Sequence, residues 1–182
     1  PLSGLTEGEI ADARPYCELI RRWFNLHPEF SWLPGKFKIA VNGAKLDETA
    51  LRIHDLGLRL LRNDKGELGF SVYVGGGLGA VAVIGSETAS FVPVEDILSY
   101  LESVMRVYNL KGRRDNIKRL RIKFLVKELG VAEFSRLVYE DWKYTKNDPE
   151  LKLNLSHLAQ LEKDFALPVK PLEISRFEEP VD

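Results

Sequence analysis

The segment WLPGKFKIAV, residues 32–41, is the first strand-like stretch of the chain and follows a helix-like one. After Pro34 its residues alternate with a period of two, so Lys36 and Lys38 share one face of the predicted strand. The opposite face carries Phe37, Ile39 and Val41. Lysines at this spacing usually form a solvated strand face. Two like charges that point the same way also suit an anion bound between them, and the spacing alone leaves both interpretations open.

The segments around this strand predict helices and a hairpin. An amphipathic helix begins at Pro15 and ends before Pro28, because apolar residues recur at helical spacing between the two prolines. Residues 58–61 and 68–74 flank NDKG as a β-hairpin. Further helices are expected at residues 93–111, 116–129, 132–139 and 155–165, and a further strand-like run at 81–84.

This order of elements predicts one α+β domain, with a single mixed or antiparallel sheet packed by helices. We expect residues 1–165 to form the domain. Residues 166–182, with prolines at 168, 171 and 180, are expected to form an extended tail or linker. The first residue is proline and not methionine, which suggests processing or an excerpt from a longer chain.

The amino-acid composition limits which classes of partner and cofactor the chain is expected to bind. The 182 residues carry 26 lysines and arginines against 27 acids, a net charge of −1, which predicts neither a nucleic-acid partner nor a membrane anchor. The single cysteine, Cys17, excludes an internal disulfide framework and a cysteine cluster for a metal, so no metal ligand is predicted here. We expect a reducing, cytoplasmic setting.

The glycines Gly75, Gly76 and Gly77 open the segment GGGLGA, which formally matches a dinucleotide-binding fingerprint. Strand-forming residues follow the segment instead of the required helix, and this argues against a nucleotide site. Three consecutive glycines also let the main chain pass close to a flat ligand, or simply make a tight turn. Both of these interpretations stay open.

A basic run, KGRRDNIKRLRIK at residues 111–123, is the strongest local charge. It is typical of a solvated helix face, and it can also form a phosphate-binding patch or a socket for several carboxylates. The near-zero net charge and the absence of aromatic residues within the run favour the socket over nucleic acid.

Taken together, these segments resemble the central part of the siroheme-dependent sulfite and nitrite reductases. The resemblance runs from about residue 10 to residue 135. It rests on ARPYCELIRRWFNLHPEFSWLPGKFKIAV, HDLGL, GFSVYVGGGLG, FVP and GRRDNIKRLRIKFLVKELG, in the order of the family.

The resemblance implies an oxidoreductase that reduces sulfite to sulfide, or nitrite to ammonia, at a siroheme coupled to a [4Fe–4S] cluster. It implies that Lys36 and Lys38 meet the substrate anion as the catalytic lysines. The triple glycine would lie along the macrocycle. The siroheme carboxylates would be held by Arg121, with Arg113, Arg114, Asn116 and Lys123 as further candidates.

Three features depart from the family pattern. Gly35 stands where the family usually has arginine, Leu120 replaces a small residue, and the cysteines that bind the cluster are absent. We therefore expect an excised domain of an assimilatory sulfite reductase haemoprotein that is inactive and binds neither cofactor by itself. Its expected partners are the remaining domains and a ferredoxin or flavoprotein electron donor. The alternatives are a nitrite reductase domain and a non-catalytic anion-binding or assembly module that retains the fold.

Overall fold

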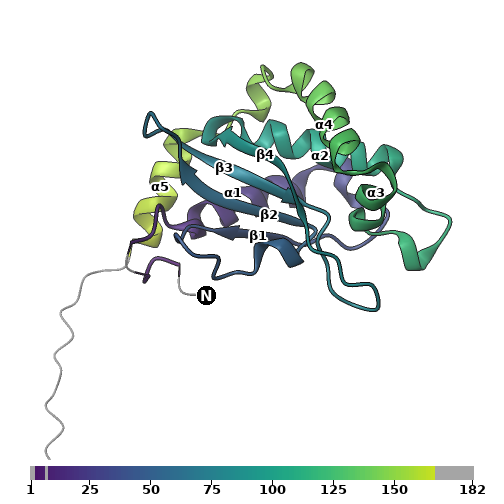
Figure 1. Ribbon diagram of the computed structural model, residues 1–182. Helices are drawn as coiled ribbons and strands as arrows, with labels where there is room; N and C mark the ends of the chain where they lie inside the picture. The colour runs from purple at the N-terminus through teal and green to yellow at the C-terminus, as the bar shows by residue number, and fades with distance from the viewer. Residues whose placement is uncertain (1–2, 7, 167–182) are drawn as a thin grey trace, which may run out of the picture.

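A computed structural model describes residues 3–6 and 8–166, which form a four-stranded sheet with helices packed against it (Figure 1). The strands are β1 (Ile39–Asn42), β2 (Leu56–Arg62), β3 (Leu68–Val74) and β4 (Ser86–Pro93). The α-helices are α1 (Ala13–Leu26), α2 (Ile97–Lys111), α3 (Ile122–Leu129), α4 (Val131–Thr145) and α5 (Leu155–Phe165). Short 3-10 helices cover Pro28–Trp32, Leu51–Ile53, Val94–Asp96, Ile117–Arg119 and Pro149–Leu151.

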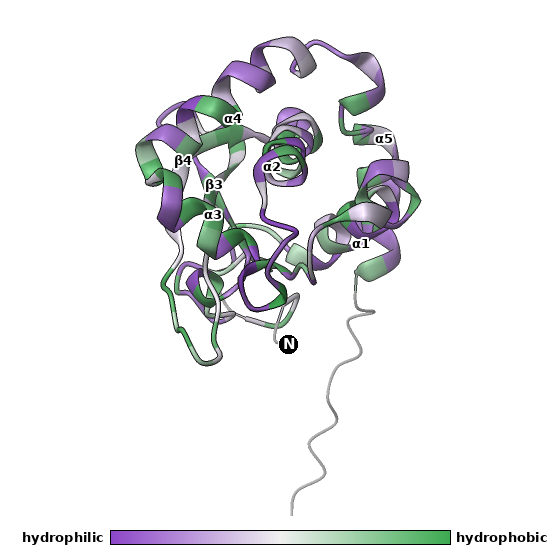
Figure 2. Cartoon of the chain, turned by 90° about the vertical axis from the view of Figure 1, so that its right-hand side faces the viewer, coloured by the Kyte–Doolittle hydropathy of each residue, from purple (hydrophilic) through white to green (hydrophobic). Residues whose placement is uncertain are grey.

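The sheet is mixed, which confirms the predicted α+β class. Its order is β1-β2-β3-β4, with β1 parallel to β2 and the other two pairings antiparallel. The predicted hairpin is β2 and β3, paired from Leu56 with Val74 to Arg62 with Leu68. Helices α1 and α2 lie on the same side of the sheet in two views at right angles (Figures 1 and 2).

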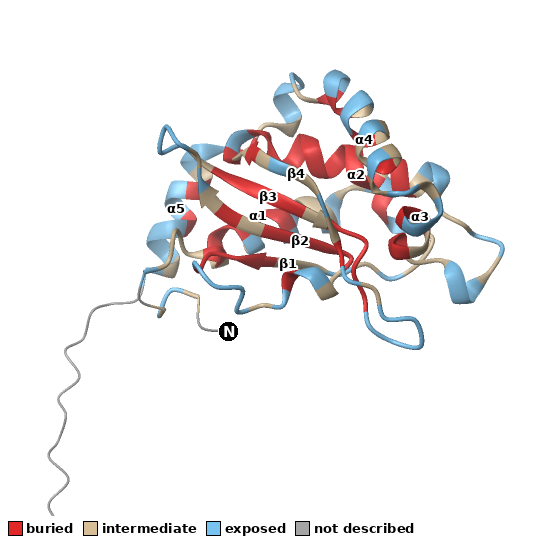
Figure 3. Ribbon diagram, viewed as in Figure 1, coloured by how far each residue is buried: buried red, intermediate tan, exposed pale blue. Residues whose placement is uncertain are grey.

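The hydrophobic core lies between the sheet and these helices. Leu58, Leu60, Phe70 and Val72 are fully buried, and Figure 3 shows the buried strand segments facing α1 and α2. The ring of Tyr16 on α1 meets Phe70 edge-on, with centroids 5.5 Å apart. Burying each large apolar side chain contributes about 1.5–3 kcal/mol, so this layer holds the sheet and α1 together.

The side chain of Asp12 caps the N-terminus of helix α1. The Asp12 carboxylate accepts a hydrogen bond from the Arg14 N–H at 2.9 Å, so α1 begins at Ala13, two residues before the predicted start. It ends at Leu26, ahead of Pro28 as predicted.

One predicted strand is absent, and one strand of the sheet was not predicted. Residues 81–84 form no strand; they belong to the loop between β3 and β4, in which Gly77 and Val83 form an isolated β-bridge. The strand is Ser86–Pro93 instead, and it was missed because it lies at the sheet edge and lacks clean apolar alternation.

Three helix predictions need corrected bounds. The α-helix expected at 93–111 begins at Ile97, after the 3-10 turn Val94–Asp96. The helix expected at 116–129 is a 3-10 turn, Ile117–Arg119, followed by α3, because Arg121 adopts an extended conformation with ψ 149°. The helix expected at 132–139 continues to Thr145, since its buried face extends to Trp142. The predicted tail, residues 166–182, lies outside the described residues apart from Ala166.

Candidate anion-binding site

The two lysines lie immediately before β1 and not within it, since the strand begins at Ile39. Both side chains are exposed, whereas Phe37 between them packs on Tyr108, with ring centroids 5.7 Å apart. The main chain of Lys38 is fixed on both sides. Its N–H donates to Asp55 Oδ2 at 3.0 Å, and its carbonyl accepts from the Leu56 N–H at 3.1 Å.

Asp55 is the residue that sequence reasoning missed. Its side chain is 0% exposed and receives two hydrogen bonds from Arg121, Nε to Oδ1 and Nη2 to Oδ2, both at 2.9 Å. Burial raises the pKa of Asp55, and the charge of Arg121 opposes that rise. The available signal was an acidic residue directly before an apolar strand in HDLGL, because a charge there needs a partner.

The triple glycine follows β3 and passes close to the protein's own main chain. Gly75 has φ +85°, and its N–H donates to the Asp55 carbonyl at 2.9 Å. A β-carbon on Gly76 would lie 2.2 Å from the carbonyl oxygen of Arg52, and one on Gly77 would lie 2.8 Å from Arg121 Nη2. Glycine is required here for close packing within the chain.

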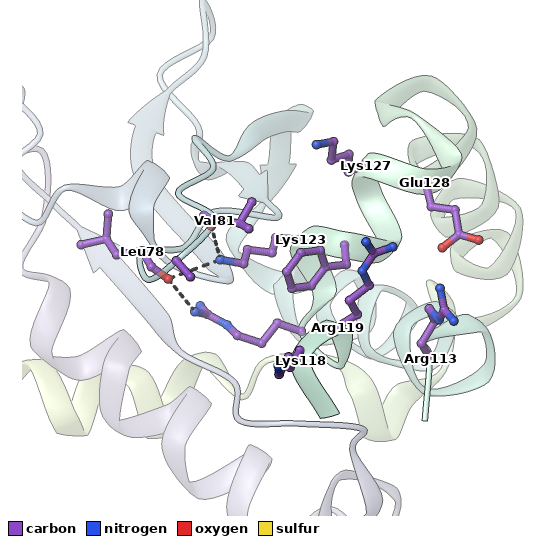
Figure 4. A pocket seen from close by; sticks show the side chains of 11 residues that line it. Leu78, Val81, Arg113, Lys118, Arg119, Lys123, Lys127 and Glu128 are labelled. Carbon is purple, nitrogen blue, oxygen red and sulfur yellow. Dashed lines mark hydrogen bonds between the residues drawn. The ribbon is translucent and has the colours of Figure 1, made fainter. Parts of the chain in front are cut away.

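Lys123 is buried and turned to the hairpin loop. Its side chain is 4% exposed, and its Nζ donates to the carbonyls of Leu78 and Val81 (Figure 4). Burial lowers the pKa of Lys123, and the neighbouring Arg121 adds to this effect. In this structure the Lys123 ammonium therefore holds the loop through these two hydrogen bonds.

The other candidates in the basic run are engaged locally. Arg113 pairs with Asp115 at 2.7 Å, and Arg114 donates to the Trp32 carbonyl at 2.9 Å. The Asn116 side chain caps the following 3-10 turn. Arg113 still lines the cleft described next, whereas Arg114 and Asn116 are not among its lining residues.

An open cleft of about 860 Å³ lies between the hairpin loop and the basic run (Figure 4). Most of its lining side chains are cationic, with one acid and a few apolar residues. They are Leu78, Ala80, Val81, Arg113, Lys118, Arg119, Arg121, Lys123, Phe124, Lys127 and Glu128. Guanidinium and ammonium groups around an apolar floor suit a flat ligand with several carboxylates.

Residues 1–146 match the family described as "Nitrite and sulphite reductase 4Fe-4S domain". The chain belongs to this family. Its oxidoreductase relatives include sulfite reductase (ferredoxin) 1 of Mycolicibacterium paratuberculosis, 29% identical over 78% of this chain and 25% of the relative. The chloroplastic ferredoxin–nitrite reductase of Arabidopsis thaliana is 31% identical over 74% of this chain and 24% of the relative.

A solved structure of the Mycobacterium tuberculosis NirA protein has the same fold. The TM-score is 0.69 at 28% sequence identity, over 79% of this chain and 26% of that one. The chain thus spans about a quarter of the length of these nitrite and sulphite reductase relatives.

The two cofactors associated with the family differ in how they fit the residues present. The basic cleft suits the carboxylates of siroheme. A [4Fe–4S] cluster needs several thiolates, and Cys17 is the single cysteine of the sequence. Within residues 3–6 and 8–166, no cluster of three or more metal-ligating side chains is present.

In the same part of the chain, no helix has the length and apolarity needed to cross a bilayer.

Proposed function

We propose that this chain is the siroheme-binding domain of an assimilatory sulfite reductase haemoprotein, where it supplies contacts to the substrate anion and to the siroheme carboxylates. The cationic cleft beside Arg121 is the observation that supports this proposal most strongly. Family membership also supports it, because residues 1–146, which match the family, include every residue that lines the cleft.

The proposed roles follow from exposure and bonding. Lys36 and Lys38 have exposed ammonium groups that can bind the oxygens of sulfite and hold protons at Nζ for the reduction. Arg121 and Arg113 can hold carboxylates at the cleft wall. Siroheme, when bound, supplies the redox-active iron. Lys123 is assigned a supporting role, since its Nζ is already bonded to the loop.

The chain alone should not turn over sulfite. The thiolates of the cluster must come from other domains of a longer reductase, since Cys17 is the single cysteine here. We propose those domains as its partners in the cytoplasm, with a ferredoxin or a flavoprotein subunit as electron donor. Nitrite is also a small anion that the same cationic side chains can bind, so nitrite reduction to ammonia is the alternative activity.

Binding measurements on the longer reductase that contains this domain test the proposal, since the 182-residue chain is not expected to bind either cofactor by itself. The variant Lys36→Ala/Lys38→Ala should keep its siroheme absorbance spectrum but lose about tenfold in sulfite affinity, the effect of one lost charge-assisted contact. Lys45→Ala/Lys65→Ala, which removes two exposed lysines away from the cleft, is the matched control and should change neither. A wild-type full-length reductase that takes up no siroheme would contradict the proposal.

One contact favours a second candidate, the non-catalytic module. A β-carbon on Gly35 would lie 3.1 Å from the β-carbon of Leu120, so the two departures from the family pattern lie against each other. No arginine side chain is available at position 35, and Leu120 narrows the space beside it. This module would bind small anions such as sulfite without taking up siroheme.

A further inference from the structure

The Asp55 carboxylate connects two of the candidate site segments from beneath the surface. It accepts both hydrogen bonds of the Arg121 fork and a third from the Lys38 N–H. The carbonyl of Asp55 accepts from the Gly75 N–H, which ties the triple glycine to the same residue. Segments that lie far apart in the sequence therefore take their relative positions from one buried residue.

The pairing also determines what Arg121 offers to a ligand. Its Nε and Nη2 atoms are turned to Asp55, whereas Nη1 reaches the Leu78 carbonyl only at 3.4 Å, on the side that lines the cleft. The Arg121–Asp55 ion pair carries no net charge when both groups are ionised. A ligand would thus meet a directed N–H group and not a freely rotating cation.

We propose that Asp55 is a positioning residue of the anion site: it orients the Arg121 guanidinium toward the cleft and fixes the main chain that carries Lys38. The proposal rests on the proposed function, because the value of this orientation lies in binding an anion. Asp55 does not act by making the site more positive, since its own carboxylate reduces the positive charge there.

The variant Asp55→Asn separates positioning from charge. It keeps the size of the side chain and makes the site more positive by one charge. A role in positioning predicts that sulfite and uroporphyrin, an iron-free tetrapyrrole with a rim of carboxylates, bind roughly tenfold more weakly despite the added charge. Unchanged or tighter binding by the folded variant would overturn the proposal.

Arg121→Lys is the second variant, because Asp55→Asn leaves the half-buried Arg121 without its carboxylate partner and can prevent folding. Lysine keeps the charge of Arg121 but cannot form the two-pronged contact, so the same loss of affinity is expected with Asp55 intact. Lys65→Arg, a change at an exposed lysine that does not line the cleft, is the control and should bind within about twofold of the wild type.

A ligand-free measurement keeps the two proposals distinguishable. Hydrogen exchange of the Lys38 amide and the Arg121 Nε–H, followed by NMR, should be slow in the wild type and at least about tenfold faster in Asp55→Asn. If the wild-type chain binds neither probe, the proposed function fails, and slow exchange still supports positioning by Asp55. Equal exchange in both proteins would overturn the positioning role.

Discussion

The buried ammonium of Lys123 on α3 donates a hydrogen bond to the main-chain carbonyl of Val81 in the loop between β3 and β4. A second bond to the Leu78 carbonyl, at 3.3 Å, makes Lys123 the clamp of this loop. The loop forms one wall of the cleft, so the position of that wall depends on Lys123, a residue that the sequence analysis predicted to bind siroheme carboxylates.

Replacing Lys123 with methionine should free the loop while leaving the core in place. Loss of a buried charged donor costs about 1–3 kcal/mol where its partners stay buried, and here those partners are carbonyls of one hairpin. Hydrogen exchange at the Val83 amide, which donates to the Gly77 carbonyl at 2.9 Å, should accelerate accordingly. Lys127→Met, on the exposed side of α3, is the control and should leave that amide unchanged. Equal protection in both variants would show that Lys123 does not hold the loop.

Gly76 should be intolerant of any side chain. An added β-carbon would lie 2.2 Å from the Arg52 carbonyl oxygen and 2.5 Å from that of His54, and both are main-chain atoms that cannot rotate away. Gly76→Ala should lower the free energy of unfolding by about 3 kcal/mol, measured by urea denaturation. Gly66→Asn is the comparison, since Gly66 has φ +80° and nothing within 4 Å of a β-carbon, and asparagine tolerates that conformation. A loss below about 1 kcal/mol at Gly76 would contradict the close approach.

The sequence predicted elements wherever apolar residues repeat with a clear period. The hairpin of β2 and β3 and the burial of Leu58 and Phe70 follow from alternation, because one face of the sheet excludes water. Strand β4 gave no such signal at the sheet edge. Periodicity reports burial along one element and carries no information about partners in distant elements.

The candidate site shows the same limit. The basic run could be located from the sequence, but its members could not be sorted into free and internally bonded groups. Arg121 lies 66 residues from Asp55, and Lys123 bonds to a loop 42 residues away. Such pairings depend on the packing of α3 against β3, which no local pattern encodes.

The contact between Gly35 and Leu120 predicts a coupled pair of substitutions. Gly35→Arg alone should crowd Leu120, because a β-carbon at position 35 already lies 3.1 Å from the Leu120 β-carbon. In a Leu120→Gly background, which removes the β-carbon at position 120, the same arginine gains room and adds a charge near the cleft. Uroporphyrin titration should show tighter binding for the double variant, by up to about tenfold, and no gain for Gly35→Arg alone. Additive effects of the two changes would contradict the coupling.

Glu102 on α2 predicts a pH-dependent stability. Its side chain is 3% exposed, with His27 Nε2 at 3.0 Å and Arg106 at 3.5 Å. Burial raises the pKa of Glu102 to about 7, and Arg106 opposes that rise while Asp141 on α4 adds to it. Between its ordinary pKa of 4.5 and about 7, the folded chain keeps a proton that the unfolded chain has released. Stability due to Glu102 therefore falls as the pH rises through this window and is constant above it.

The isosteric variant Glu102→Gln removes this titration and keeps the shape of the core. Wild type should lose about 3 kcal/mol relative to the variant between pH 4.5 and pH 7, from the difference between the folded and ordinary pKa. Burial lowers the pKa of His27, so its own contribution rises with pH over the same range. Because His27 Nε2 lies 3.0 Å from Glu102, both proteins also carry His27→Gln, which removes this contribution from the comparison. Urea denaturation at several pH values measures the difference. If the gap between the two proteins stays constant or moves in favour of the wild type as the pH rises, Glu102 is ionised in the folded chain throughout and the buried cluster stabilises its charge.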